Sequence, residues 1–320
     1  MKMNKVFSLC TDIQTFTGFN RTLVIDITRG NHHLISKKWS EIILKIDNCN
    51  KKELQEKITP EEKEIFHDVL SFLKKNNYIF EVDRNVKSQF KEINMTFETP
   101  FIFDLCFCEV SQANFKDIIE MINTHESYTF GGFHFLIYNL ADEQLAEFKN
   151  RINSLELNKN IELYIASSKI DYFLADKSRN VSIHEASFSN NKEMKNHFYE
   201  KFPIMNIGMK QILESKDFNF FHNKTLFINE NGNIVNSLFD QDPLIFRNIK
   251  ECIKNKNSLN DLISDQRFTQ YWQLDNSKIV VCKDCEFRRV CIDCRPPILN
   301  NNEWYKEECS YNPYLSQWKN

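Results

Sequence analysis

Residues 281–309 read VCKDCEFRRVCIDCRPPILNNNEWYKEEC, and this stretch holds five of the ten cysteines of the 320-residue chain. The cysteines follow the spacing C-x2-C-x5-C-x2-C, and a last one comes after a gap of fourteen residues. Thiolates this close together on short loops can converge on one soft metal centre, whereas a regular helix or strand would hold them apart. We therefore predict a metal-binding knuckle, whose candidate ligands are Cys282, Cys285, Cys291, Cys294 and Cys309.

The composition indicates a folded protein in a reducing compartment. A chain of 320 residues can form two or three domains, and its formal net charge of −3 offers no basic surface for nucleic acid. The sequence has no stretch of about 18 apolar residues, so we expect no membrane span. The first residues, MKMNKVFSLC, lack the apolar region of a secretion signal. We therefore expect a cytoplasmic protein. In the reducing cytoplasm, clustered cysteines hold metal more often than they form disulfides.

Residues 1–90 have the pattern of a small separate unit. Short strands are predicted over Lys5–Cys10 and Thr22–Ile27, joined as a hairpin by a turn at Gly18–Asn20. A helix is predicted from about Lys37, because four apolar residues recur there with helical spacing. These residues are Trp39, Ile42, Ile43 and Ile46. A second, shorter helix is predicted over Lys52–Ile58.

The third predicted helix has the clearest boundaries. Thr59 is placed to cap it, with Pro60 at the first position and Glu62 completing a capping box. Its apolar stripe consists of Ile65, Val69, Phe72 and Leu73. The helix should end at Asn76–Asn77, which tolerate a left-handed backbone, and a returning strand is predicted over Tyr78–Val82. The resulting order, β-β-α-α-α-β, is that of a winged-helix-like module.

This order, with the ending FLKKNNYIFEV (residues 72–82), resembles the PqqD-like peptide-recognition element of enzymes that modify ribosomally made peptides. The resemblance implies that a leader peptide adds a strand to the edge of the hairpin and lies against the third helix. The same pattern also suits a winged-helix regulator that binds DNA. The acidic start of the third helix and its lack of a basic stripe count against that alternative.

Residues 83–96 are polar and predict a linker, after which residues 96–215 alternate between strand and helix patterns. Strands are predicted over Phe101–Val110, Phe133–Tyr138, Ile161–Ala166 and Val181–His184. Helices are predicted over Phe115–Ile122, over Asp142–Leu155 and in part over Ile170–Ala175. This alternation is typical of βαβ units with a parallel sheet, so the predicted fold class is α/β.

From residue 216 the pattern changes to a hairpin followed by helices. Asn231–Gly232 predicts the turn between two strands, Phe218–Ile228 and Ile234–Leu238. Helices are expected after PLIFRNIKE (residues 243–251) and over Leu259–Trp272, and the cysteine knuckle follows.

The segments FINENGNIVNS (residues 227–237), IFRNIKE (residues 245–251) and the C-x2-C-x5-C run resemble a SPASM domain, which carries auxiliary iron–sulfur clusters in many radical SAM peptide-modifying enzymes. With the ending SYNPY (residues 310–314), the whole layout is most similar to the grasp-with-spasm peptide maturases. This resemblance implies two partners, a ribosomally made precursor peptide and an ATP-grasp ligase. It also implies one complete ligand set for a cluster: Cys282, Cys285, Cys291 and Cys309.

The chain departs from that family at its other clusters. Nine residues separate Gly232 from His222 and four separate it from Ser237, and the family has cysteines at both of these places. Cys294 serves the same first cluster in the family, so its partners are depleted here. Radical chemistry also needs a C-x3-C-x2-C loop, which is absent from residues 1–281. We therefore expect no S-adenosylmethionine cofactor and a degenerate, partial (β/α) barrel over residues 96–215.

The remaining cysteines and histidines have simpler interpretations. Cys106 and Cys108 lie on a predicted strand with no third cysteine nearby. His32–His33 are expected in a solvated turn. Cys10, Cys49 and Cys252 are expected to be ordinary core or surface residues.

Two metal centres remain open for the knuckle, and reduced free thiols are the third alternative. Four thiolates suit a 4Fe–4S cluster, which the resemblance implies, or a structural Zn²⁺. In either case Cys294 could replace Cys291 or Cys309 as the fourth ligand.

Three functions follow from these expectations. The first is a peptide-maturation protein acting with an ATP-grasp ligase, in which residues 1–90 recognise the leader, residues 96–215 form the degenerate barrel and residues 216–320 the SPASM-like domain. The second is a redox peptide-modifying enzyme that uses one 4Fe–4S cluster. The third is a zinc-containing winged-helix regulator that binds DNA. The sequence leaves open whether the protein is itself a catalyst.

Overall fold

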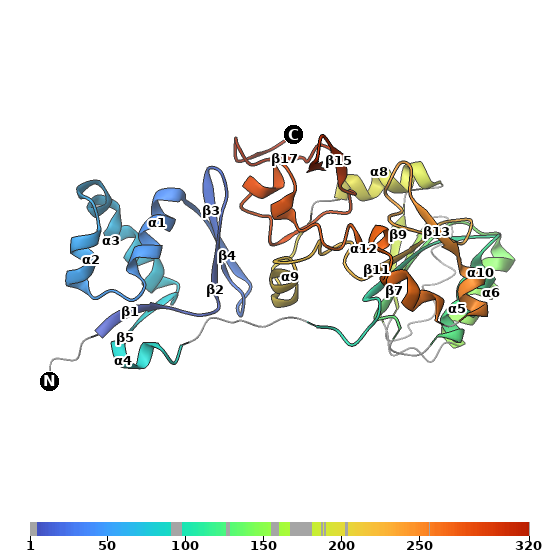
Figure 1. The fold of residues 1–320 in the computed structure, drawn as a ribbon, viewed down its shortest axis with the longest axis horizontal. Helices are drawn as coiled ribbons and strands as arrows, with labels where there is room; N and C mark the ends of the chain where they lie inside the picture. The colour runs from blue at the N-terminus through green and yellow to red at the C-terminus, as the bar shows by residue number, and fades with distance from the viewer. Residues whose placement is uncertain are drawn as a thin grey trace.

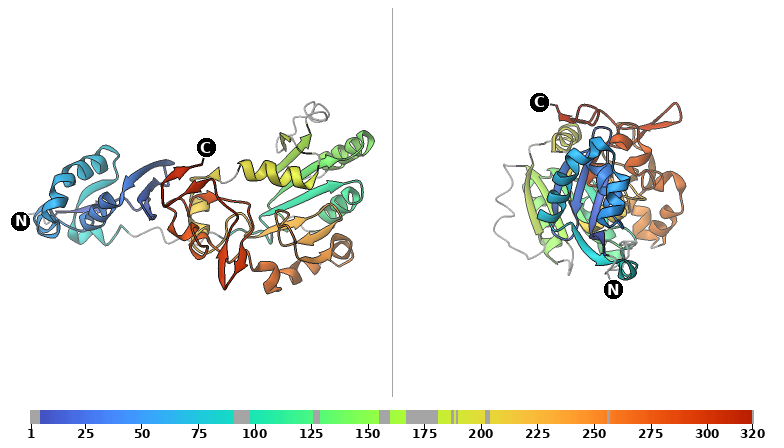
Figure 2. Two further views of the ribbon diagram at one scale, coloured as in Figure 1. Left: turned by 90° about the horizontal axis from the view of Figure 1, so that it is seen from above. Right: turned by 90° about the vertical axis from the view of Figure 1, so that its left-hand side faces the viewer.

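The computed structural model of this protein has three parts (Figure 1). They are a small N-terminal part, a part built on a seven-stranded sheet, and a cysteine-rich segment between these two. The structure describes residues 5–90, 98–125, 129–154, 160–166, 181–186, 188, 190–201, 204–255 and 257–319. The N-terminal part lies at one end of the long axis and the large sheet at the other (Figure 2). The protein is therefore of mixed α/β class, as predicted.

Five strands form the sheets of the N-terminal part. They are β1 (Lys5–Leu9), β2 (Ile13–Thr17), β3 (Arg21–Asp26), β4 (Asn31–Ser36) and β5 (Ile79–Asp83). The predicted turn at Gly18–Asn20 is present, but it joins β2 to β3, and β1 pairs with β5 instead. The prediction that Lys5–Cys10 is the first strand of the hairpin is therefore wrong. The amide of Ile13 donates to the carbonyl of Cys10 at 3.1 Å, and this turn separates β1 from β2.

Four helices are described in this part; the first three begin within one residue of the predicted positions, and the last was not predicted. They are α1 (Lys37–Ile46), α2 (Lys51–Lys57), α3 (Pro60–Lys75) and α4 (Arg84–Lys87). The amide of Glu62 donates to the Thr59 hydroxyl at 3.3 Å and the amide of Thr59 donates to the Glu62 carboxylate at 2.7 Å, so the capping box is confirmed. Asn77 has a φ of 57°, the left-handed conformation expected after α3. The short helix α4 corrects the predicted linker, because Lys87 forms an ion pair with Asp47 of the same part.

The large sheet combines a parallel run with an antiparallel edge. Its strands are β6 (Leu105–Ser111), β7 (Gly132–Asn139), β8 (Asn160–Ala166), β9 (Val181–Ala186), β11 (Thr225–Ile228), β12 (Asn233–Val235) and β13 (Ile245–Asn248). The order is β13-β12-β11-β6-β7-β8-β9, with β11 and β6 to β9 parallel. Gly232, with a φ of 74°, lies in the predicted turn between β11 and β12. Strands β6 to β9 and β11 to β13 share this sheet, and residues of both groups share one core, so the segments before and after residue 216 pack together.

Helices cover one face of this sheet more fully than the other. The helices of this part are α5 (Phe115–Thr124), α6 (Asp142–Ser154), α8 (Asn191–Lys201), α9 (Met209–Glu214), α10 (Ile249–Lys254), α11 (Ser258–Ile263) and α12 (Gln266–Thr269). Cys106 and Cys108 pack with α5, α6 and α10, whereas Phe107 between them packs with α8 on the opposite face. The sequence did not predict α8, because only Met194 and Phe198 bury apolar side chains along it.

The cysteine-rich segment is built from short strand pairs. They are β10 (Ile204–Met205) with β14 (Cys291–Ile292), β15 (Ile298–Asn300) with β16 (Glu303–Tyr305), and β17 (Tyr311–Asn312) with β18 (Gln317–Trp318). The β2–β3–β4 sheet packs against this segment. Its Val24 joins the core under α1 and α3, while Leu23 and Ile25 form a core with Phe287 and Tyr311. One sheet therefore joins the N-terminal helices to the cysteine segment.

Two other predictions in these regions have mixed outcomes. His32 and His33 lie in the strand β4, so the predicted turn is wrong. His32 is exposed to solvent, as predicted, whereas the half-buried ring of His33 contacts Phe72 at a centroid distance of 5.1 Å. In this strand the side chains of His33 and Leu34 point to opposite faces of the sheet. The helix predicted over Ile170–Ala175 lies outside the described residues.

Candidate metal centre

Four of the five knuckle cysteines line one small cavity. Cys282 begins a short 3-10 turn, and the amide of Cys285 donates to its carbonyl at 3.0 Å. Cys291 lies on β14, and Cys309 precedes β17. These four side chains surround a cavity of about 30 Å³ that Met205 and Tyr311 also line. The turn, the strand pair and the terminal hairpin therefore bring together the predicted ligand set, whose members are Cys282, Cys285, Cys291 and Cys309.

Cys294 lies apart from this cavity. It is fully buried on the other side of the segment, in the core that Phe227 and Phe239 form on the α8 face of the large sheet. Burial raises the pKa of its thiol well above the ordinary value. The structure thus separates Cys294 from the other four and gives it the surroundings of a core residue.

The cysteine cavity has side chains of a suitable type to bind a metal, but they are not arranged as a coordination sphere. All ten cysteines are free thiols. Among the residues that the structure describes, no three His, Cys, Asp or Glu side chains lie close enough together to hold a metal ion. Burial raises the pKa of Cys282 to about 11 and that of Cys285 to about 12, so both are neutral thiols without a metal. The four residues fit a soft metal by donor type, and their sulfurs would have to move closer together to bind one.

A buried charged triad, Asp293, Arg295 and Lys306, lies beside these cysteines. The Asp293 carboxylate accepts from Arg295 at 2.8 and 3.0 Å and lies 3.5 Å from the Lys306 ammonium. Burial alone would lower the pKa of Lys306, but the Asp293 carboxylate and the nearby Cys282 and Cys291 hold it above the ordinary value. The triad carries two positive charges and one negative charge. A net buried cation stabilises thiolates, and hence an anionic metal–thiolate centre.

The backbone before the first cysteine is strained. Val281 has a φ of 71° and a ψ of −49°, a conformation that β-branched residues rarely adopt. Strain of this kind persists only where the surrounding structure fixes the chain, and it concentrates at functional sites.

His222 and Ser237, which stand where the resemblance to SPASM domains would place cysteines, contact each other. Both are fully buried, and the Nε2 atom of His222 lies 3.3 Å from the hydroxyl of Ser237. The Nδ1 atom of His222 lies 3.3 Å from the side-chain oxygen of Asn219. The two residues that were identified by their distance in sequence from Gly232 are therefore in contact in the structure. They form a polar contact inside an aromatic core, where Phe221 and Phe227 lie against the imidazole.

The neutral imidazole of His222 predicts a loss of stability in mild acid. Burial lowers the pKa of His222 from 6.5 to about 3, so between these values the unfolded chain binds a proton that the folded chain does not. The contribution of the neutral His222 to the free energy of unfolding is complete above the pKa of the unfolded chain. It is lost, at about 1.4 kcal/mol per pH unit, as the pH falls toward the pKa of the folded chain. In urea unfolding at about pH 7, 6 and 5, His222→Gln should flatten this dependence. An unchanged slope in the variant would contradict the assignment.

The tip of the β2–β3 hairpin docks on the knuckle. The amide of Phe19 donates to the Asp284 carbonyl at 2.7 Å. The Arg21 guanidinium donates to the Glu286 carboxylate at 2.6 Å and to the Tyr311 hydroxyl at 2.9 Å. A Cβ atom on Gly18 would lie 2.6 Å from the Glu286 amide nitrogen, so this approach requires glycine. The candidate metal centre is therefore part of the interface between the two ends of the chain.

The aromatic residues near the C-terminus act mainly in packing. Tyr311 contacts the rings of Phe287 and Trp318 at 5.0 and 4.9 Å, and Trp304 lies 6.5 Å from Tyr271. These contacts stabilise a segment with few other core residues.

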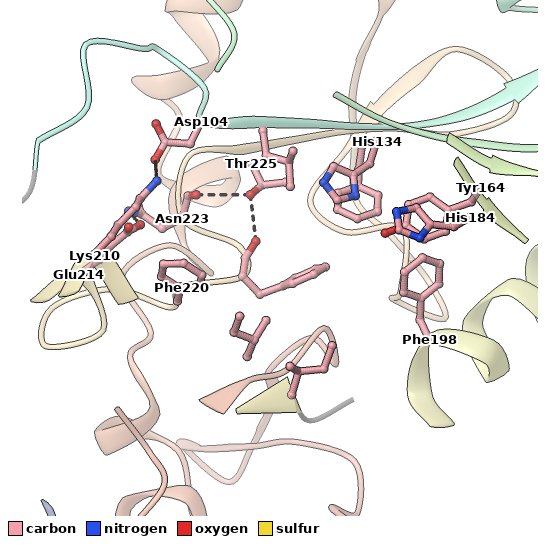
Figure 3. Close-up of a pocket in the computed structure, with 15 residues that line it drawn as sticks. Asp104, His134, Tyr164, His184, Phe198, Lys210, Glu214, Phe220, Asn223 and Thr225 are labelled. Atoms are coloured by element: carbon pink, nitrogen blue, oxygen red, sulfur yellow. Dashed lines mark hydrogen bonds and ion pairs between the residues drawn. The ribbon is translucent and has the colours of Figure 1, made fainter. Parts of the chain in front are cut away.

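Sequence reasoning missed a second cavity, which we call the sheet pocket. It has a volume of about 480 Å³ and lies on the α8 face of the large sheet (Figure 3). Its aromatic end includes His134, Tyr164 and His184, and its polar end includes Asp104 and Glu214. His134 lies between Phe133 and Phe135 in β7, and Tyr164 lies between Leu163 and Ile165 in β8, but no local pattern brings these strands together.

The strand pair β10–β14 separates the two cavities. Ile204 and Ile292 line the sheet pocket, while Met205 and Cys291, the next residues along the same strands, line the cysteine cavity. The pocket and the candidate ligands thus lie on opposite sides of a ribbon two strands wide.

Comparisons with known proteins give no family for this chain. No described helix has both the length and the apolarity needed to cross a membrane. No protein-family model and no curated protein matches the sequence, so its function has to be inferred from the sites themselves.

Proposed function

We propose that this chain is a peptide-maturation protein that acts with an ATP-grasp ligase on a ribosomally made precursor. In this proposal the N-terminal part is a winged-helix-like leader-recognition module of the PqqD type. The large parallel sheet is a partial (β/α) barrel, and the cysteine segment is a SPASM-like end that holds the core peptide or docks the ligase. The chain performs no radical chemistry with S-adenosylmethionine, and it works in the cytoplasm.

The observation that carries this proposal is the open edge of β4. Among the described residues, β4 pairs only with β3, so its outer edge has backbone donors and acceptors available for a further strand. Helix α3 adjoins this edge, because His33 on β4 contacts Phe72 on α3. Leu34 on β4 is 41% exposed and adds an apolar contact beside the edge. An edge strand next to a helix is the arrangement that leader recognition by strand addition needs.

The position of this edge also supports a link between leader and core peptide. Leu34 lies opposite Leu23 in the sheet, and Leu23 packs in the core shared with the cysteine segment. Alternate residues of an added strand would therefore point toward α3 and toward the cysteine segment. A leader bound at β4 would bring the following residues of the precursor close to the knuckle.

Titration of a synthetic leader peptide of the cognate precursor into the full-length protein tests the proposal. We expect micromolar binding to the wild type and at least a tenfold loss for Leu34→Glu, because a charge beside the edge repels an apolar strand. Leu44→Glu is the matched control: Leu44 is 70% exposed on α1 and is not a residue of β4 or α3. The proposal fails if the wild type does not bind, or if both variants weaken binding equally.

We also propose that Cys282, Cys285, Cys291 and Cys309 hold a metal centre. The family resemblance favours a 4Fe–4S cluster, whereas the cavity of about 30 Å³ is closer in size to a single Zn²⁺. When bound, the metal would supply a rigid crosslink among three loops, and the charged triad would balance its thiolate charge. The hairpin tip would then dock on a fixed surface.

A redox peptide-modifying enzyme is the second candidate function. The sheet pocket, one ribbon away from Cys291, supports it, because a substrate group held there would lie next to the proposed centre. Anaerobically purified protein would be brown in this case, and colourless protein that holds zinc would exclude it.

A further inference from the structure

We propose that the sheet pocket binds an uncharged small molecule with an apolar body and a hydroxyl group. This goes beyond the proposed function, which requires no such ligand. The volume of the pocket, about 480 Å³, is within the usual range for small-molecule sites. Its polar side chains lie at two ends, with Asp104 and Glu214 at one and His134 and Tyr164 at the other (Figure 3).

Apolar side chains form most of the remaining lining. They come from the helix α8, the strands β10 and β14, and the segment before β11, so distant parts of the chain enclose one space. These residues are Phe198, Ile204, Ile292, Phe220 and Phe221. A ligand that covers this surface is stabilised in proportion to the apolar area that it removes from water. The body of the ligand is therefore apolar.

The charges at the first end of the pocket are matched within the protein. The Lys210 ammonium lies 2.9 Å from the Asp104 carboxylate. Burial raises the pKa of Glu214, and the Asn223 amide donates to its Oε1 atom at 2.6 Å. The ammoniums of Lys210 and Lys224 act on this pKa in the opposite direction, so they offset a negative charge on Glu214. A charged ligand would lose its hydration here without gaining an unmatched counter-charge, so the pocket selects an uncharged one.

The second end of the pocket presents the edges of aromatic rings. Phe107, His134, Tyr164 and His184 stack on one another across four neighbouring strands, with successive centroids 4.4, 5.8 and 4.8 Å apart. The Nε2 atom of His184 forms a hydrogen bond with the Glu162 carboxylate. Burial lowers the pKa of His134 to about 3 and raises that of Tyr164 to about 12, so the imidazole is neutral and the phenol stays protonated. A neutral phenol can donate a hydrogen bond to a ligand hydroxyl and accept one from it, which places the hydroxyl of the ligand beside Tyr164.

Three probes with the same six-carbon chain test the selection of an uncharged ligand. They are 1-hexanol, n-hexylamine and hexanoate, which differ only in the charge of the polar group. In calorimetric titrations of the full-length protein we expect 1-hexanol to bind at least tenfold more tightly than either of the others. Equal or tighter binding of the amine or the carboxylate would overturn the proposal, and so would no binding of 1-hexanol up to its solubility limit. Tighter binding of N-acetylleucine amide than of 1-hexanol would assign the pocket to a peptide side chain instead.

A variant pair locates the site. Tyr164→Phe keeps the ring and removes only the hydroxyl, so it should weaken 1-hexanol about fivefold through the loss of one hydrogen bond. Tyr305→Phe makes the same change on β16, outside the lining of the pocket, and should leave the affinity unchanged. Equal affinities in the two variants would overturn the place of the hydroxyl beside Tyr164. If Tyr164→Phe does not fold, the comparison of probes on the wild type still decides the proposal.

Discussion

Cys291→Ala should abolish metal retention, whereas Cys294→Ala, three residues further along the chain, should leave it intact. Cys291 lines the cysteine cavity with the three other candidate ligands, and Cys294 is buried in the aromatic core on the other side of the segment. Loss of one thiolate leaves the soft metal with three of its four sulfur ligands. Structural zinc contributes roughly 10–16 kcal/mol of apparent binding free energy, so the metal-free protein should also unfold more readily.

Elemental analysis of anaerobically purified wild type and variants measures this result. Iron with sulfide identifies a cluster, and zinc identifies a structural ion. Cys294→Ala provides the control for loss of a buried sulfur, which should cost only about 1–3 kcal/mol of stability through the cavity it leaves. Equal metal contents in the two variants would show that the division of the five cysteines is wrong.

Local signals allowed much of the N-terminal part to be predicted. The caps at Thr59 and the apolar stripe of α1 depend on residues within a turn or two of each other. The partner of β1 was mispredicted because the choice depends on β5, more than sixty residues away in the chain. Nothing in the local pattern of KVFSL distinguishes these two partners.

The candidate metal centre also has features that the sequence predicted and features that it did not. The spacing of the cysteines predicted a common site for all five, and the resemblance to SPASM domains implied the four that share a cavity. By spacing alone Cys294, three residues after Cys291, would be a nearer partner than Cys309. The docking of Gly18 and Arg21 on Glu286 was not predictable, since it depends on how two distant segments pack. The sheet pocket was missed for the same reason, as each of four strands contributes one ring to its wall.

Removal of Arg21 should release the N-terminal part from the knuckle. The Glu286 side chain is fully buried, its Oε1 atom accepts from Arg21 at 2.6 Å and from the Tyr311 hydroxyl at 2.5 Å, and its Oε2 atom has no partner among the described residues. Arg21→Ala would therefore leave a buried carboxylate without its cation, a change that costs about 3–5 kcal/mol. Urea unfolding measures the loss, and small-angle X-ray scattering should detect a longer particle as the hairpin tip undocks.

Two further variants separate this interface from a general loss of stability. Arg267 pairs with Asp265 and is 74% exposed on its side chain, so Arg267→Ala should cost less than about 1 kcal/mol. Combining Arg21→Ala with Glu286→Gln should recover part of the loss, because a neutral amide tolerates burial better than a carboxylate. If Arg21→Ala behaves like Arg267→Ala, the ion pair does not hold the two ends of the chain together. If it undocks the hairpin while metal content is unchanged, the knuckle forms independently and the N-terminal part docks on a site that is already complete.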